Sequence, residues 1–147
     1  FEDRTNGYRQ ALTESSIAFR DDFVLTVDGS YDSAYRTASG NLKLISQATA
    51  IYVQSDIVTL GVVNALQDAG LRIPQDISIV GSDGYELGAI SRPQFDSVAH
   101  PILELVDLAL SRLIEIAGKA QPQMPRQIIL RPYVIERGSV GNLAIIE

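Results

Sequence analysis

Short apolar runs alternate along the chain with amphipathic stretches. Residues 23–27, 50–53 and 76–81 have the length and β-branching of buried strands. Apolar residues recur at spacings of three and four over residues 31–45 and 57–69, which predicts helices. Strands alternating with helices favour right-handed crossovers, so we predict an α/β fold: a mostly parallel sheet with helices on both faces in three αβα layers.

The two ends of the chain extend this alternation. A helix is predicted over residues 4–15, a strand over 97–100 and a late strand over 128–135. Pro101 suits the first turn of a helix that ends near Gly118. Its predicted buried face consists of Ile102, Leu105, Val106, Ala109, Leu113 and Ile116.

Composition narrows the class of protein. The 147 residues are about one domain's length, 46% are hydrophobic, and the longest apolar run is too short to span a bilayer. Cysteine is absent, which excludes disulfides and thiolate metal sites. A net charge of −6 argues against direct binding of nucleic acid by these residues, because phosphate contacts need clustered Lys and Arg.

No catalytic motif is present in the sequence. It contains neither a G-x-S-x-G nucleophile elbow nor a glycine-rich phosphate-binding loop of either common type. Its single histidine, His100, cannot form a metal site by itself and is more typical of a structural or hinge residue than of a general base. We therefore predict a non-enzymatic protein with no cofactor and no metal.

Polar residues follow three of the predicted strands. Asp28 comes after the first, Ser55 and Asp56 after the second, and Asp83 after the third. Ligands of parallel α/β sheets bind outside the carboxyl ends of the strands, so these groups could hold a polyhydroxylated ligand such as a sugar. The alternative is that Asp28 and Asp56 are turn and capping residues, which is the favoured interpretation for Asp56 alone.

Several segments together resemble a known family. The chain is similar to the C-terminal part of LacI/GalR-family transcription regulators, whose sensor module has the type I periplasmic-binding-protein fold. The resemblance rests on RTNGYRQAL at 4–12, AIYVQSD at 50–56, AGLRIPQDISIVGSD at 69–83, ISRP at 90–93 and ERGS at 136–139. The resemblance covers nearly the whole chain.

This resemblance implies a function and a set of site residues. Residues 1–147 would be the C-terminal part of the effector-binding and dimerisation domain of a cytoplasmic repressor, without its DNA-binding headpiece and most of its N-terminal subdomain. Operator DNA would be bound only through that headpiece, and a sugar-like effector would be held by Arg4, Tyr31, Ser55 and Asp83. Ser55 replaces the family's usual asparagine, and Ser82 replaces the usual aromatic residue before Asp83.

The helix over residues 57–69 has more apolar surface than one sheet can cover. Ile57, Leu60 and Gly61 form a second stripe beside the one that faces the core, and Ile90 adds an apolar group in a stretch that reads as an exposed loop. We expect these four residues to lie in a homodimer interface, in agreement with the resemblance.

Two other functions remain open at this point. The same fold could belong to a periplasmic or secreted sugar-binding protein of a transporter; a signal peptide upstream would favour that function, whereas a helix-turn-helix followed by a short hinge segment would favour regulation. A flavodoxin-like α/β enzyme has only the fold class in its favour. The ISRP segment and the second apolar stripe favour the regulator.

Overall fold

A four-stranded sheet forms the centre of the structure. The computed structural model describes residues 2–117 and 127–142. Strands β1 (Ala50–Tyr52), β2 (Ser78–Asp83) and β3 (Asp96–Ala99) run parallel in that order, and β4 (Tyr133–Ile135) pairs antiparallel with β3. The prediction of a mostly parallel sheet is confirmed.

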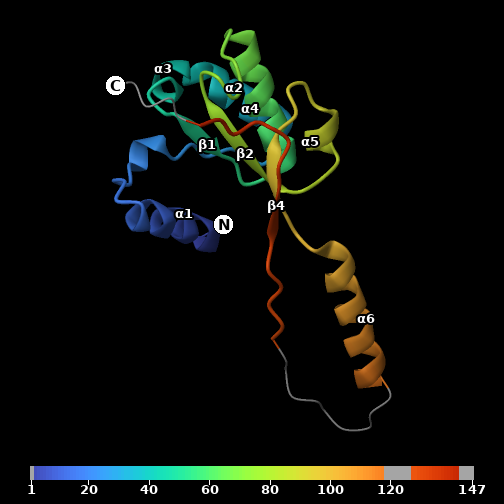
Figure 1. Cartoon of the computed structure of the whole chain (residues 1–147). Coiled ribbons are helices and arrows are strands. Elements are labelled where there is room, and N and C mark those ends of the chain that lie inside the picture. The colour runs from blue at the N-terminus through green and yellow to red at the C-terminus, as the bar shows by residue number, and fades with distance from the viewer. Residues whose placement is uncertain (1, 118–126, 143–147) are drawn as a thin grey trace.

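Helices lie on both sides of this sheet. Figure 1 shows α2 (Tyr31–Gly40), α3 (Leu42–Ile45) and α4 (Asp56–Asp68) on one side and α1 (Glu2–Glu14) on the other. The remaining helices are α5 (Leu87–Ile90) and α6 (Ile102–Ala117), and a single 3₁₀ turn covers Asp21–Phe23. The predicted α/β fold is thus observed.

The core is built around α4. Val63 and Leu66 of this helix are fully buried, together with Ile79 of β2 and Phe95 just before β3. Helix α2 packs closely against α4 at Gly61: a Cβ atom at this position would lie only 2.5 Å from the carbonyl oxygen of Tyr31. The α4 helix therefore packs on both the sheet and α2.

The sequence-predicted elements differ from the observed ones in four places. The helix predicted over residues 31–45 is divided at Asn41 into α2 and α3, and α5 occupies part of the predicted exposed loop. Residues 24–27 belong to none of the described strands, so the strand predicted at 23–27 is wrong for this structure. The late strand covers only Tyr133–Ile135.

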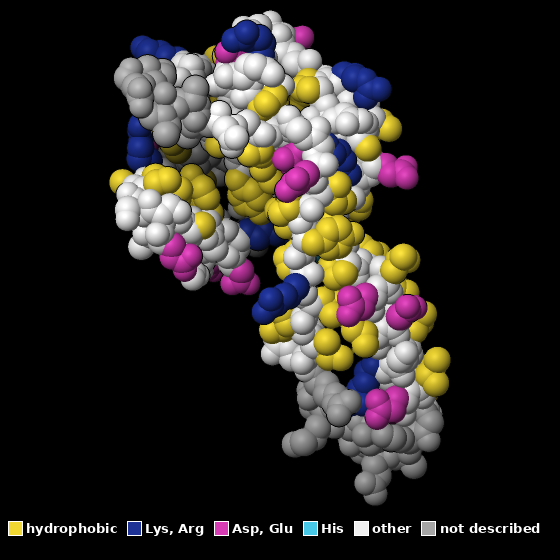
Figure 2. Space-filling view, viewed as in Figure 1, with side chains coloured by type: hydrophobic (Ala, Val, Ile, Leu, Met, Phe, Trp, Pro, Cys, Tyr) yellow, Lys and Arg dark blue, Asp and Glu magenta, His cyan; other side chains and the backbone are white. Residues whose placement is uncertain are grey.

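Helix α6 corrects the burial prediction. All of its predicted buried residues are exposed, since α6 projects away from the sheet (Figure 1). Figure 2 shows apolar side chains spread over this helix. An apolar face needs a neighbouring layer to cover it, and the described residues supply none. None of the helices within residues 2–117 and 127–142 is long and apolar enough to cross a membrane.

The connection from α4 to β2 contains a bidentate ion pair. The guanidinium of Arg72 donates to both carboxylate oxygens of Asp76 at 2.6 and 2.8 Å, and the backbone N–H of Arg72 donates at 2.8 Å. These hydrogen bonds lower the pKa of Asp76 to about 2; the guanidinium bonds contribute most and the backbone bond comes next.

Because of this ion pair, the stability of the fold is expected to change with pH in the acid range. A lowered carboxyl pKa stabilises the fold above its unfolded-state value near 4, and the contribution is lost as pH falls from there through about 2. We expect Asp76→Asn to lower the Tm at pH 6 and to match the parent chain near pH 2. Thermal unfolding of both chains from pH 6 to 2 measures this; a difference that is constant with pH would contradict it.

Candidate functional site

A large groove separates β1 from the chain segment that follows the 3₁₀ turn. It encloses about 810 Å³ and is bounded by residues 23–29, by β1 with residues 53–55, and by α1. Figure 2 shows the hollow beside α1, with apolar side chains next to it. The apolar side chains that line it include Val24, Leu25, Ile51, Val53, Val58 and Val62.

Polar groups gather at one end of this groove. Arg4, Ser55 and Asp83 all line it, as do Asp28 and Gln54. This is the end where β1 and β2 finish, so the strand-end groups converge as the parallel topology predicts. Three of the four predicted effector residues are thus brought to one place.

Arg4 and Ser55 approach this end from different elements. Arg4 is an exposed residue of α1 whose Nη1 donates to the carbonyl oxygen of Gln54 at 2.6 Å. Ser55 precedes α4, but its side chain makes no capping hydrogen bond to that helix. Both side chains can offer hydrogen bonds to the oxygen atoms of a ligand.

Asp83 has an unusual backbone conformation. Its φ is +113°, a region that residues other than glycine rarely adopt. Its Oδ2 accepts the backbone N–H of Asp56 at 3.4 Å, and its Oδ1 lies 4.0 Å from Nε2 of His100. The sequence reasoning did not place His100 in the site, because the strand was predicted over residues 97–100; the observed β3 ends at Ala99, so His100 follows a strand end as the other site residues do.

Asp28 is a turn residue at the edge of the site. Its Oδ1 accepts the hydroxyl of Ser30 at 2.6 Å and the backbone N–H of Ser30 at 2.9 Å, and these bonds lower the pKa of Asp28. Ser30 in turn caps α2 by accepting the N–H of Ser33. The turn interpretation of Asp28 is supported, although the residue also lines the groove.

Tyr31 does not join the other predicted effector residues. Its hydroxyl accepts a hydrogen bond from Asn64 of α4 at 2.8 Å, and its ring stacks on Tyr35 at 6.3 Å between centroids. Tyr31 is absent from the groove lining, whereas Tyr52 of β1 is part of it. The sequence reasoning missed Tyr52 because an aromatic residue within a strand run is equally typical of a core.

The four residues predicted to form the dimer interface differ in their exposure to solvent. Ile57 is 42% exposed and Ile90 is 70% exposed. Leu60 is partly buried and packs against the core, and Gly61 is buried against α2 of the same chain. The prediction that Gly61 contributes to an outer surface is therefore corrected, because α2 already covers it.

Comparison with known proteins decides the family. A family described as "Periplasmic binding protein-like domain" matches residues 1–140. This chain belongs to that family. The periplasmic binding protein-like domain thus occupies nearly all of the sequence, which agrees with the fold predicted from the resemblance.

Similar proteins are transcription regulators. The domain is 34% identical to catabolite control protein A of Priestia megaterium over 90% of this chain and 40% of that protein. It is 31% identical to the ribose operon repressor of Haemophilus influenzae over 97% of this chain and 42% of that protein. The resemblance to LacI/GalR-family regulators is confirmed, and the chain spans less than half the length of these relatives.

A solved structure shows the same architecture. The domain superposes on a LacI-family transcriptional regulator from Enterococcus faecium with bound ribose, with a TM-score of 0.82 and 26% identity. The match covers 96% of this chain and 52% of that one. Both the sequence relatives and this structure favour a regulator over the solute-binding protein of a transporter.

Proposed function

We propose that this domain is the effector-sensing and dimerisation part of a cytoplasmic DNA-binding repressor and that it performs no catalysis. The observation that carries the proposal is the convergence of Arg4, Ser55 and Asp83 at the carboxyl ends of the strands. Asp83 would accept hydrogen bonds from two hydroxyls of a sugar-like effector, and Arg4 would donate to its oxygen atoms. Effector binding would shift domain closure and thereby operator affinity.

Titration calorimetry of the full-length regulator tests this function. Ribose, cellobiose, glucose and a purine nucleoside would be titrated in turn, and operator binding would be measured with and without the ligand that binds. We expect one compound to bind and to change operator affinity. Ligand binding with no effect on DNA binding would favour the solute-binding alternative.

The domain is also proposed to be the C-terminal part of a longer chain. Its relatives are more than twice its length, and its net charge of −6 suits a protein that reaches DNA through another domain. Segments outside this chain would cover the exposed apolar face of α6 and fill the groove. The open backbone along the groove supports this part of the proposal.

The edge of β1 that faces the groove is unpaired in the described structure. Thr49 and Val53 hydrogen-bond to β2, and backbone groups alternate along a parallel strand, so those of Ala50 and Tyr52 point into the groove. On its other side, the backbone of residues 25–27 makes no hydrogen bond within residues 2–117 and 127–142. An extended segment lying between them would pair with both.

Hydrogen exchange can detect such a segment in the full-length regulator. We expect the amides of Ala50 and Tyr52 to exchange as slowly there as those of Ile51 and Val53, because both edges of β1 would be paired. In the 147-residue chain, Ala50 and Tyr52 should exchange much faster than their two neighbours. Fast exchange at Ala50 and Tyr52 in both proteins would show that no strand occupies the groove.

A homodimer through α4 and α5 completes the proposed function. Ile57 and Ile90 present exposed apolar groups, and Leu60 lies partly buried beside them. A two-fold axis near these residues would bring each one close to its counterpart in the partner.

A further inference from the structure

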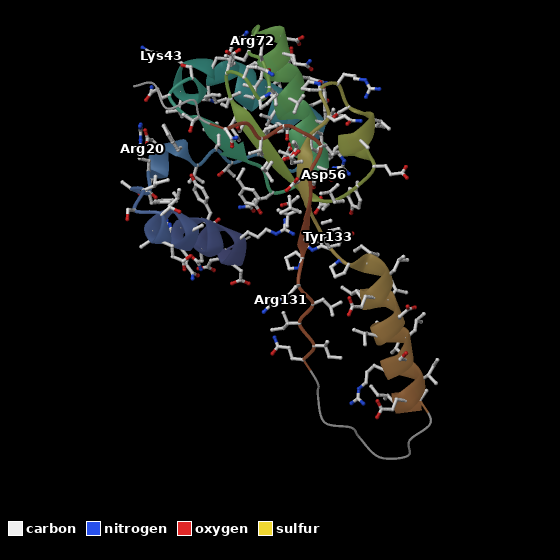
Figure 3. The ribbon with its side chains drawn as sticks, viewed as in Figure 1. Arg20, Lys43, Asp56, Arg72, Arg131 and Tyr133 are labelled. Atoms are coloured by element: carbon white, nitrogen blue, oxygen red, sulfur yellow. The ribbon has the colours of Figure 1, made fainter. Side chains whose placement is uncertain are left out.

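A buried carboxylate contacts the loop that follows Asp83, which connects β2 to α5 over residues 84–86. Asp56, in the first turn of α4, has no solvent exposure and sits inside the domain, where α4 meets β2 and β3 (Figure 3). Its Oδ2 accepts the backbone N–H of Tyr85 at 2.7 Å, and its Oδ1 accepts the hydroxyl of Ser97 at 2.6 Å. The capping interpretation drawn from sequence does not describe these contacts, since both oxygens bind outside α4.

Ser97 connects this carboxylate to the same loop a second time. It is fully buried in β3, and its oxygen accepts the backbone N–H of Gly84 at 3.0 Å while its proton goes to Asp56. The N–H groups of the two residues that follow Asp83 are therefore both held, one by each side chain. We call Asp56 and Ser97 the loop clamp.

The absence of a side chain at Gly81 leaves room for the carboxylate of Asp56. A Cβ atom at Gly81 would lie 2.6 Å from Oδ1 of Asp56, so this carboxylate fits only because position 81 lacks a side chain. Within residues 2–117 and 127–142 Asp56 forms no ion pair, and its charge is balanced by the two donors and by the N-terminus of α4. Loss of one of these hydrogen bonds would leave a buried charged group without a partner, which destabilises the folded state.

We propose that Asp56 and Ser97 are positioning residues that hold Asp83 in the conformation needed to bind the effector. Asp83 has a φ of +113°, and such a conformation persists in a residue other than glycine only when its surroundings impose it. The clamp imposes it by fixing Gly84 and Tyr85 immediately after Asp83. This role rests on the proposed effector site, while the clamp itself exists without any ligand.

The first arm of the test needs no ligand. Ser97→Ala removes the bond to Gly84 and one bond to Asp56. Ser139→Ala is the matched control, because Ser139 is also a fully buried serine but bonds to Asp96 and Ile79 instead. In the full-length regulator we expect exchange at the Gly84 and Tyr85 amides to rise about tenfold or more in Ser97→Ala and to change little in Ser139→Ala.

A milder variant guards against loss of the fold. Asp56→Asn keeps the volume of the side chain, can still accept the N–H of Tyr85 and can donate to Ser97. We expect it to raise exchange at Gly84 and Tyr85 less than Ser97→Ala does. Unchanged exchange at these two amides in both folded variants would overturn the clamp.

The second arm asks whether the clamp acts through Asp83. With ribose, cellobiose, glucose and a purine nucleoside as probes, Ser97→Ala should weaken the bound probe about tenfold, yet add almost nothing to Asp83→Ala. Additive effects, or no effect of Ser97→Ala, would overturn the positioning role. A bound probe unaffected by Asp83→Ala, or no bound probe at all, would count against the proposed site instead, and the exchange arm would then decide the clamp alone.

Discussion

Replacing Asp83 with alanine is expected to weaken effector binding by the full-length regulator about a hundredfold. Two hydrogen bonds from sugar hydroxyls to a carboxylate, each contributing about 1.5–3 kcal/mol, would be lost together. The change removes only a side chain that is 20% exposed at the mouth of the groove. Calorimetry with the probe that binds the unaltered protein measures the loss.

Two variants make this result specific. Asp83→Asn removes the charge but tolerates a positive φ better than alanine, so it separates loss of the carboxylate from strain in the backbone. Asp32→Ala removes an exposed carboxylate in the first turn of α2 that does not line the groove, and it should leave affinity unchanged. Equal affinities for the parent, Asp83→Ala and Asp83→Asn would rule out Asp83 as an effector ligand.

Introducing a charge at Ile90 should dissociate the proposed dimer. Ile90 is 70% exposed in the single chain, so Ile90→Asp does not disturb the core of the protomer. In an apolar two-fold interface the carboxylate would be buried without a partner, and twice per dimer. We expect the dissociation constant of the dimer to rise about thirtyfold or more, as at a central interface residue.

Sedimentation velocity over a range of concentrations measures this change. Gln67→Asp is the control, because Gln67 is an exposed residue near the C-terminal end of α4, at the opposite end of that helix from Ile57. Ile90 is a better position than Leu60 for this test of the dimer. Leu60 packs partly against the core, so a charge at Leu60 would also destabilise the fold of the single chain. A monomeric parent protein, or a mutant that dimerises as tightly, would refute an interface at this surface.

Much of the fold could be predicted because its signals are local. Gly70, with a φ of +82°, comes just after the C-terminal end of α4, since the end of a helix depends on hydrogen bonds within a few residues. Polar residues after the strands gave the site, because parallel strands necessarily bring their carboxyl ends to one edge. Ser55 and Asp83 could therefore be named from the strand pattern, whereas Arg4, which lies in α1, was named only through the resemblance to LacI/GalR-family regulators.

Other features depended on neighbours far away in the sequence. Residues 23–27 have the composition of a strand, but a strand exists only where another backbone accepts its hydrogen bonds. Helix α6 is amphipathic, yet its burial requires a layer that the described residues do not contain. Local pattern predicts what a segment can form and leaves open what it packs against.

The functional site shows the same division. The sequence by itself determined that Asp56 and Asp83 lie at the carboxyl ends of two strands and that Tyr31 begins a helix. Only the tertiary structure decided that Asp56 turns inward to Ser97 and that Tyr31 bonds to Asn64 instead of facing the groove. The physical reason is that side-chain direction follows from close packing between elements, here α2 against α4 and α4 against β2 and β3, which no local pattern encodes.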